Sequence, residues 1–128
     1  LKKEMNYKAV PKTVFTFPEI GSVGLTEQEA KDAGYDVVVG KFNLQGNGKS
    51  LIAGESGLVK IVAEKKYNEI LGVHMIGPQA TELIAEATLA ISMEATLDDL
   101  NDTIHAHPSV SEAIKEASLD ALGRAIHC

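Results

Sequence analysis

The sequence contains a single cysteine, Cys128, and is poor in basic side chains. One cysteine excludes a disulfide within the chain and a zinc site built from cysteines alone. The 12 Lys and Arg residues against 18 Asp and Glu give a net charge of −6. We therefore expect no nucleic-acid partner and no anionic membrane, because both attract clustered Lys and Arg. The chain also lacks an apolar run of the roughly 20 residues that a membrane-spanning helix needs.

The chain begins with polar residues and has the composition of a globular protein. Leu1-Lys2-Lys3-Glu4 has no apolar signal-peptide core, and Leu1 is not an initiator methionine. We therefore expect a piece of a longer protein. Hydrophobic residues make up 45% of the 128 positions and charged residues 23%, which suits one domain over residues 1–128.

The first half of the sequence predicts β-structure. Residues 58–64 alternate, with Val59, Ile61 and Ala63 on one face, and they should form a hairpin with residues 70–77. Further strands are expected at residues 13–17, 20–25 and 36–44. A capping box, Thr26-Glu27-Gln28-Glu29, predicts a short helix that ends near Gly34.

The second half predicts helices. Residues 79–93 carry one apolar stripe at helical spacing and a second apolar set on another side. The stripe is Leu83, Ile84, Ala87, Ala90 and Ile91, and the second set is Ala85, Leu89 and Met93. One side can cover the sheet, and the other needs a further helix or a second subunit. Thr96-Leu97-Asp98-Asp99 starts a short helix, and Ser109-Val110-Ser111-Glu112 is a capping box before the last one. We therefore expect an α+β fold, an antiparallel sheet with helices on one face.

One glycine-rich segment imitates a phosphate-binding loop. Gly46-Asn47-Gly48-Lys49-Ser50 follows a predicted strand, but the loop pattern places a glycine where Asn43 stands. Leu51 likewise occupies the third glycine position of the dinucleotide fingerprint. We interpret the segment as a plain turn.

The segment around two histidines, Ile104 to Glu112, holds the candidate chemistry. His105 and His107 do not combine with other ligands at a usual metal spacing, so we predict no metal site. A carboxylate from Glu112 on one ring nitrogen of His107 would leave the other nitrogen free to move a proton. Glu112 also stands where a capping-box Glu belongs, and the spacing alone leaves both interpretations open. His74 and His105 are expected to be packing or hydrogen-bonded residues.

Several ordered segments carry a family resemblance. They are residues 17–27, residues 70–78, His107-Pro108-Ser109-x-Ser111-Glu112 and residues 121–127. Together they resemble the pyridine nucleotide-disulfide oxidoreductases, and within that family its dihydrolipoamide dehydrogenase branch. Phe17-Pro18 and His107-Pro108 look like the cis peptide bonds of the family.

The resemblance implies a C-terminal dimerisation (interface) domain of an FAD- and NAD-dependent oxidoreductase. The flavin and the redox-active cysteine pair would belong to the N-terminal part of a longer chain, so this piece alone should be inactive and bind no cofactor. In the homodimer, His107 would be the acid/base, Glu112 would orient it, and His107-Pro108 would contact the flavin of the partner subunit. The implied substrate is the dihydrolipoyl group of a 2-oxo acid dehydrogenase complex, in the cytoplasm or the mitochondrial matrix.

The sequence departs from the family pattern in places. Ser109 replaces the usual Thr, and Phe17 precedes Pro18 where a polar residue is frequent. Glutathione-reductase-like enzymes usually have Glu-Glu where this chain has Glu112-Ala113, and mercuric-reductase-like ones need a C-terminal cysteine pair. These differences favour the lipoamide branch. The alternatives are another flavin disulfide reductase or a dimerisation module without chemistry.

Overall fold

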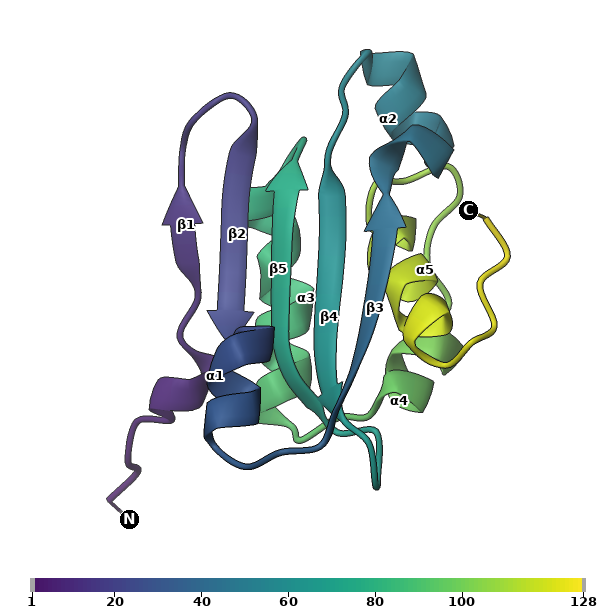
Figure 1. Ribbon diagram of the computed structural model, residues 1–128. Coiled ribbons are helices and arrows are strands. Elements are labelled where there is room, and N and C mark those ends of the chain that lie inside the picture. The colour runs from purple at the N-terminus through teal and green to yellow at the C-terminus, as the bar shows by residue number, and fades with distance from the viewer. Residues whose placement is uncertain (1, 128) are drawn as a thin grey trace.

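Five antiparallel strands form one sheet in the order β1-β2-β5-β4-β3 (Figure 1). The computed structural model describes residues 2–127, so the single cysteine, Cys128, lies outside the described residues. The strands are β1 (Lys12–Val14), β2 (Glu19–Gly24), β3 (Val37–Asn43), β4 (Leu58–Glu64) and β5 (Ile70–Gly77). The helices are η1 (Tyr7–Ala9), α1 (Glu27–Asp32), η2 (Leu44–Gly46), α2 (Gly48–Ala53), α3 (Ala80–Ser92), α4 (Leu97–Asp102) and α5 (Glu112–Ala121).

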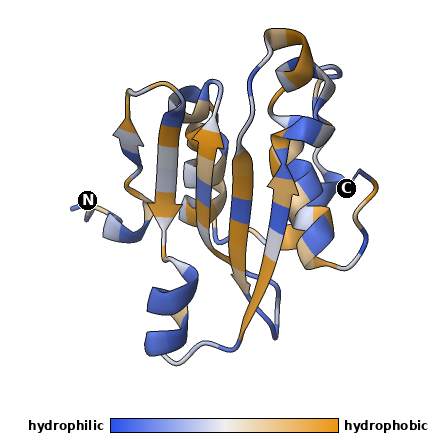
Figure 2. Cartoon of the chain, turned by 45° about the horizontal axis from the view of Figure 1, so that its top comes forward, coloured by the Kyte–Doolittle hydropathy of each residue, from blue (hydrophilic) through white to orange (hydrophobic). Residues whose placement is uncertain are grey.

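The predicted hairpin forms the middle of the sheet. β4 and β5 have the predicted bounds and pair antiparallel, with Val59 opposite Met75 and Ile61 opposite Val73. All four side chains are buried. Figure 2 shows the apolar stretches along these strands, in contrast to the mostly hydrophilic α1.

The two longest helices cover one face of the sheet, which confirms the predicted α+β class. α3 packs on β2 and β5, and α5 packs on β3 and β4 (Figure 1). Their buried side chains, including Ile84, Ile91 and Ile114, join those of the strands in one hydrophobic core. The second apolar set of α3 stays outside this core, because Leu89 and Met93 are 64% and 72% exposed.

The short helix α1 is held to the opposite face of the sheet. Lys60 alternates with the core residues of β4, and its Nζ lies 2.7 Å from Glu27 Oε2. Thr26 caps the helix by accepting from the Glu29 N–H, as predicted, and Gly34 follows its end at φ +92°. Hydrogen bonds from Lys60 and Lys31 lower the pKa of Glu27 to about 2, so the ion pairs persist in mild acid.

Two local predictions are wrong. The strand expected at residues 13–17 ends at Val14, because residues 15–18 form the turn to β2, where the Thr16 hydroxyl donates to the Pro18 carbonyl at 2.9 Å. The plain turn expected at residues 46–50 is replaced by the end of η2 and the start of α2. Asn47 caps α2, and Gly54, in the left-handed region at φ +68°, ends it after six residues.

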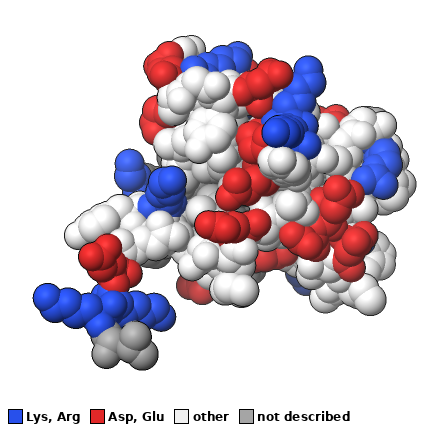
Figure 3. Space-filling view, turned by 90° about the horizontal axis from the view of Figure 1, so that it is seen from below, with Lys and Arg blue, Asp and Glu red and all other residues white. Residues whose placement is uncertain are grey.

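The surface carries both signs of charge, and no helix in the described part of the chain suits a membrane. Figure 3 shows acidic side chains gathered on the face seen from below, with lysines and arginines beside them. The longest helix, α3, has 13 residues, and among residues 2–127 none is both long and apolar enough to cross a bilayer.

Helix α5 approaches β3 closely at Gly40, and this contact yields a test of the packing. A Cβ at Gly40 would lie 2.0 Å from the Ala117 carbonyl oxygen, so Gly40→Ala must displace α5. We expect this variant to lose about 1–3 kcal/mol of unfolding free energy, measured by urea denaturation. The control is Gly48→Ala, where a Cβ meets nothing within 4 Å. Equal stability of the two variants would contradict the close packing.

Candidate functional site

The candidate site lies on the loop of residues 103–111, between α4 and α5. The loop contains the His107-Pro108 peptide bond, which is cis, as is Phe17-Pro18, and both sequence predictions are confirmed. The His107 side chain is 82% exposed, and Pro108 is exposed beside it. The tip of the loop is therefore open to a second surface.

Glu112, the first residue of α5, makes two hydrogen bonds to this loop. Its Oε1 lies 2.8 Å from His107 Nδ1, and its Oε2 accepts from the Ser109 N–H at 3.0 Å. The second bond is half of the predicted capping box. Glu112 thus makes both contacts that the spacing allowed, because each oxygen of its carboxylate has its own partner.

The hydroxyl half of the predicted capping box is wrong. The Ser109 hydroxyl donates to the Ala106 carbonyl at 2.5 Å, and α5 starts at Glu112 instead of Val110. Ser111 is the N-cap residue, but its side chain makes no capping bond. The Ser109 hydroxyl instead bonds within the loop, to the Ala106 carbonyl and to the Ser111 hydroxyl at 2.8 Å.

The hydrogen bonds of Glu112 determine its charge and the tautomer of His107. Burial raises the pKa of Glu112, but the bonds from the Ser109 N–H and from His107 outweigh burial, so the pKa lies below its usual 4.5. The carboxylate is therefore an acceptor at neutral pH, and His107 Nδ1–H donates to it. In the neutral ring, Nε2 then carries the free lone pair and can accept a proton.

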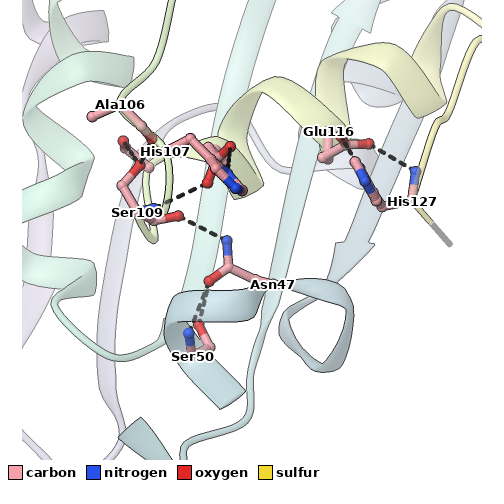
Figure 4. Close-up of polar contacts among 9 residues, drawn as sticks. Asn47, Ser50, Ala106, His107, Ser109, Glu116 and His127 are labelled. Atoms are coloured by element: carbon pink, nitrogen blue, oxygen red, sulfur yellow. Dashed lines mark hydrogen bonds and ion pairs between the residues drawn. The ribbon is translucent and has the colours of Figure 1, made fainter. Parts of the chain in front are cut away.

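Asn47, which sequence reasoning did not select, reaches this loop from α2. Its Nδ2 donates to the Ser109 carbonyl at 2.8 Å, and its Oδ1 accepts from the Ser50 N–H at 2.9 Å and from its hydroxyl at 3.0 Å (Figure 4). The residue is 5% exposed. The sequence signal for it is an N-cap asparagine three residues before Ser50, which does not reveal a contact across 62 positions.

The remaining histidines each have separate partners. His105, with a side chain 5% exposed, contacts Glu86 at 2.5 Å, and His74 contacts the Leu25 carbonyl at 2.9 Å. Both are hydrogen-bonded residues, as predicted. His127 Nδ1 lies 2.7 Å from an oxygen of Glu116 (Figure 4). Glu116 is one helical turn beyond Glu112 on α5. Within residues 2–127, no three His, Cys, Asp or Glu side chains gather as metal ligands would.

A cavity in the sheet half of the molecule lies away from His107. It measures about 590 Å³ and is lined by η1, β2 and β5, with Tyr7, Ser22 and His74 among its residues. His107 does not line this cavity, and its side chain is exposed at the tip of the loop.

Comparison with known proteins gives the family. A sequence model described as "Pyridine nucleotide-disulphide oxidoreductase, dimerisation domain" matches residues 10–118. The dihydrolipoyl dehydrogenase of Bacillus subtilis is 55% identical over 92% of this chain, and that of Halobacterium salinarum is 50% identical over 96%. The mitochondrial enzyme of Pisum sativum is 45% identical over 96%. These matches cover 25–26% of each relative, so the chain spans about a quarter of their length.

Solved structures agree with this result. LpdA of Mycobacterium tuberculosis superposes with a TM-score of 0.85 and 27% identity, over 91% of this chain and 26% of its own. The HOCl-induced flavoprotein disulfide reductase RclA of Escherichia coli superposes with a TM-score of 0.81 and 25% identity, over 85% of this chain and 25% of its own. The fold, the loop geometry and the match over residues 10–118 lead to one conclusion: the chain belongs to the dimerisation-domain family of the pyridine nucleotide-disulphide oxidoreductases.

Proposed function

We propose that this chain is the dimerisation domain of a dihydrolipoamide dehydrogenase, in which His107 and Glu112 are the acid/base pair of the partner subunit's active site. The observation that supports this most is the 2.8 Å contact between His107 Nδ1 and Glu112 on an open loop. It occurs in a chain whose relatives named above are dihydrolipoyl dehydrogenases, 45–55% identical to it.

This chain would contact the cofactor of the partner subunit only through the loop that carries His107. FAD, held by the rest of the full-length enzyme, would carry electrons from the reduced disulfide to NAD. Within residues 2–127, the segment that resembles a phosphate loop leads into a helix of only six residues, which is unlike a dinucleotide site. The His107-Pro108 segment is exposed, so it can contact the ring of a flavin held by the partner subunit.

His107 would move the proton. Nε2 takes the proton from a thiol of the dihydrolipoyl group. The resulting thiolate attacks one sulfur of the redox disulfide, which forms a mixed disulfide, breaks the S–S bond and releases the other sulfur as a thiolate. Glu112 keeps Nδ1 protonated, aims the ring and stabilises the imidazolium. The pair needs no rearrangement for this step, since the 2.8 Å bond is already formed in the single chain.

The uncovered side of α3 would form part of the dimer interface. Ala85, Leu89 and Met93 are exposed on this side of the helix. A second copy of the chain across a twofold axis would bury them, as the dimerisation family suggests. The same dimer would place His107 beside the other subunit's disulfide, where the dihydrolipoyl group of a 2-oxo acid dehydrogenase complex enters.

Replacing the proposed base tests its role. His107→Gln in the full-length enzyme should lower turnover with dihydrolipoamide by roughly 10²–10⁴-fold, because positioned acid–base catalysis contributes that much. Flavin absorbance should be retained. The matched control is His127→Gln. His127 pairs with Glu116, which lies on α5 like Glu112, so this variant disrupts a similar His–Glu contact. Normal turnover of the His107 variant, or equal losses in both, would refute the assignment.

The lowered pKa of Glu112 predicts a pH-dependent contribution to stability. A carboxyl whose pKa falls on folding stabilises the protein above its usual pKa of 4.5, and this contribution is lost as pH falls through the folded value. Thermal unfolding should therefore show Glu112→Gln to be less stable than the wild type at pH 7. The difference should shrink below about pH 4.5. A difference that is constant with pH would contradict an ionised Glu112.

Charge on the uncovered side of α3 should disrupt the dimer. Leu89 is 64% exposed in the single chain and would be buried in the dimer. The variant Leu89→Lys would therefore place an unpaired lysine charge in the interface, which is costly. We expect sedimentation of the full-length variant to shift from dimer to monomer. Tyr67→Lys, at a residue that is 70% exposed on the β4–β5 turn, is the control and should stay dimeric. A dimeric Leu89 variant would exclude this side of α3.

A further inference from the structure

Ser109, the residue that follows Pro108, is held by hydrogen bonds on both sides. The Ser109 N–H donates to Glu112 Oε2 at 3.0 Å, and the Ser109 carbonyl accepts from Asn47 Nδ2 at 2.8 Å. Figure 4 shows Asn47 between Ser50 and Ser109. The same carboxylate of Glu112 then bonds His107 through its other oxygen. Asn47 is thus linked to the His107 ring through two further residues.

We propose that Asn47 is a positioning residue for His107. By holding the Ser109 carbonyl, its amide keeps the Ser109 N–H aimed at Glu112, and Glu112 keeps the His107 ring in one orientation. This inference rests on the proposed function of His107. Asn47 is the N-cap residue of the six-residue helix α2. The inference therefore gives the start of α2 a role in the chemistry of a loop whose Ser109 lies 62 positions away.

The burial of Asn47 makes this link specific. The residue is 5% exposed, and its amide oxygen is already occupied by the backbone and hydroxyl of Ser50. The side chain is therefore anchored at one end, and its NH₂ group has a defined direction. Without that donor, the Ser109 carbonyl loses its partner in a part-buried position, which favours a different arrangement of the loop.

The other end of the loop has a separate anchor. His105 contacts Glu86 of α3 at 2.5 Å and the Thr103 carbonyl at 3.1 Å. Loss of the Asn47 bond should therefore release the segment next to Glu112 and leave the segment before His107 in place. We expect a local change in the orientation of His107 and not an unfolded loop.

Asn47→Ser in the full-length enzyme tests the inference. Serine is as good an N-cap as asparagine, so α2 is retained, but it lacks the NH₂ donor for Ser109. Turnover with dihydrolipoamide should fall roughly 10–100-fold, since a small misplacement of a catalytic group has effects of this size. Reduction of an artificial acceptor by NADH, which needs no proton from a thiol, should be unchanged, as should the KM for NAD.

The matched control is Asn43→Ser. Asn43 also caps a helix, η2, by accepting from the Gln45 N–H at 2.9 Å, but it is exposed and, within residues 2–127, forms no hydrogen bond to residues 103–111. It should keep both activities. Asn47→Asp, which keeps the size and the cap but replaces the donor by an acceptor, should show the same selective loss as Asn47→Ser.

The outcomes separate this inference from the proposed function. Unchanged turnover in both Asn47 variants, equal loss of both reactions, or loss of flavin and dimer in both variants would overturn the positioning role. A wild-type enzyme that does not oxidise dihydrolipoamide, or a His107→Gln variant with normal turnover, would instead refute the proposed function.

Discussion

The two hydrogen bonds of the Glu112 carboxylate are the constraint on which the candidate site depends. One oxygen accepts from the Ser109 N–H at the start of α5, and the other accepts from His107. The position of His107 therefore follows the position of α5. That helix is in turn placed by its contact with β3, where Gly40 has no side chain to hold the two apart and Asp120 accepts from the Lys41 N–H at 2.8 Å. The packing of α5 on the sheet therefore determines where the helix starts, and the start of the helix determines the orientation of the His107 ring.

Local signals in the sequence predict most of the fold. Alternation predicts β4, and the hairpin pattern predicts β5, both with the observed bounds. Helix α4 starts after Thr96 as expected, and the structure shows a capping box there. The errors arise where one local preference competes with another. Aromatic and β-branched residues favour a strand through Phe17, but the turn that brings β2 back beside β1 needs those positions. Residues 46–50 contain glycines typical of a turn, yet Asn47 caps a short helix there.

The part of the candidate site that depends on residues close in sequence is also predictable. His107 and Glu112 are five positions apart, so a pattern in the sequence indicates their contact. The spacing also suggests that Ser109 caps α5, and only the path of the chain after Pro108 decides that its hydroxyl bonds Ala106 instead. Asn47 lies 62 positions from Ser109, and no local pattern encodes a contact of that range. It depends on the way β3, η2 and α2 pass beside the loop.

Under the proposed function, the exposure of His107 means that the pair in one chain needs a second surface to complete the site. The bond to Glu112 is already made, but the ring is 82% exposed to water. Charged groups gain catalytic strength where water is excluded, because the lower effective dielectric constant strengthens their interactions. The partner surface would supply that exclusion. The His105–Glu86 contact joins the same loop to α3, the helix with the uncovered apolar side, so the segment that carries His107 and the proposed interface are parts of one packed unit. Under the proposed function, folding of the single chain forms the contact between His107 and Glu112, and dimerisation makes the pair reactive by excluding water.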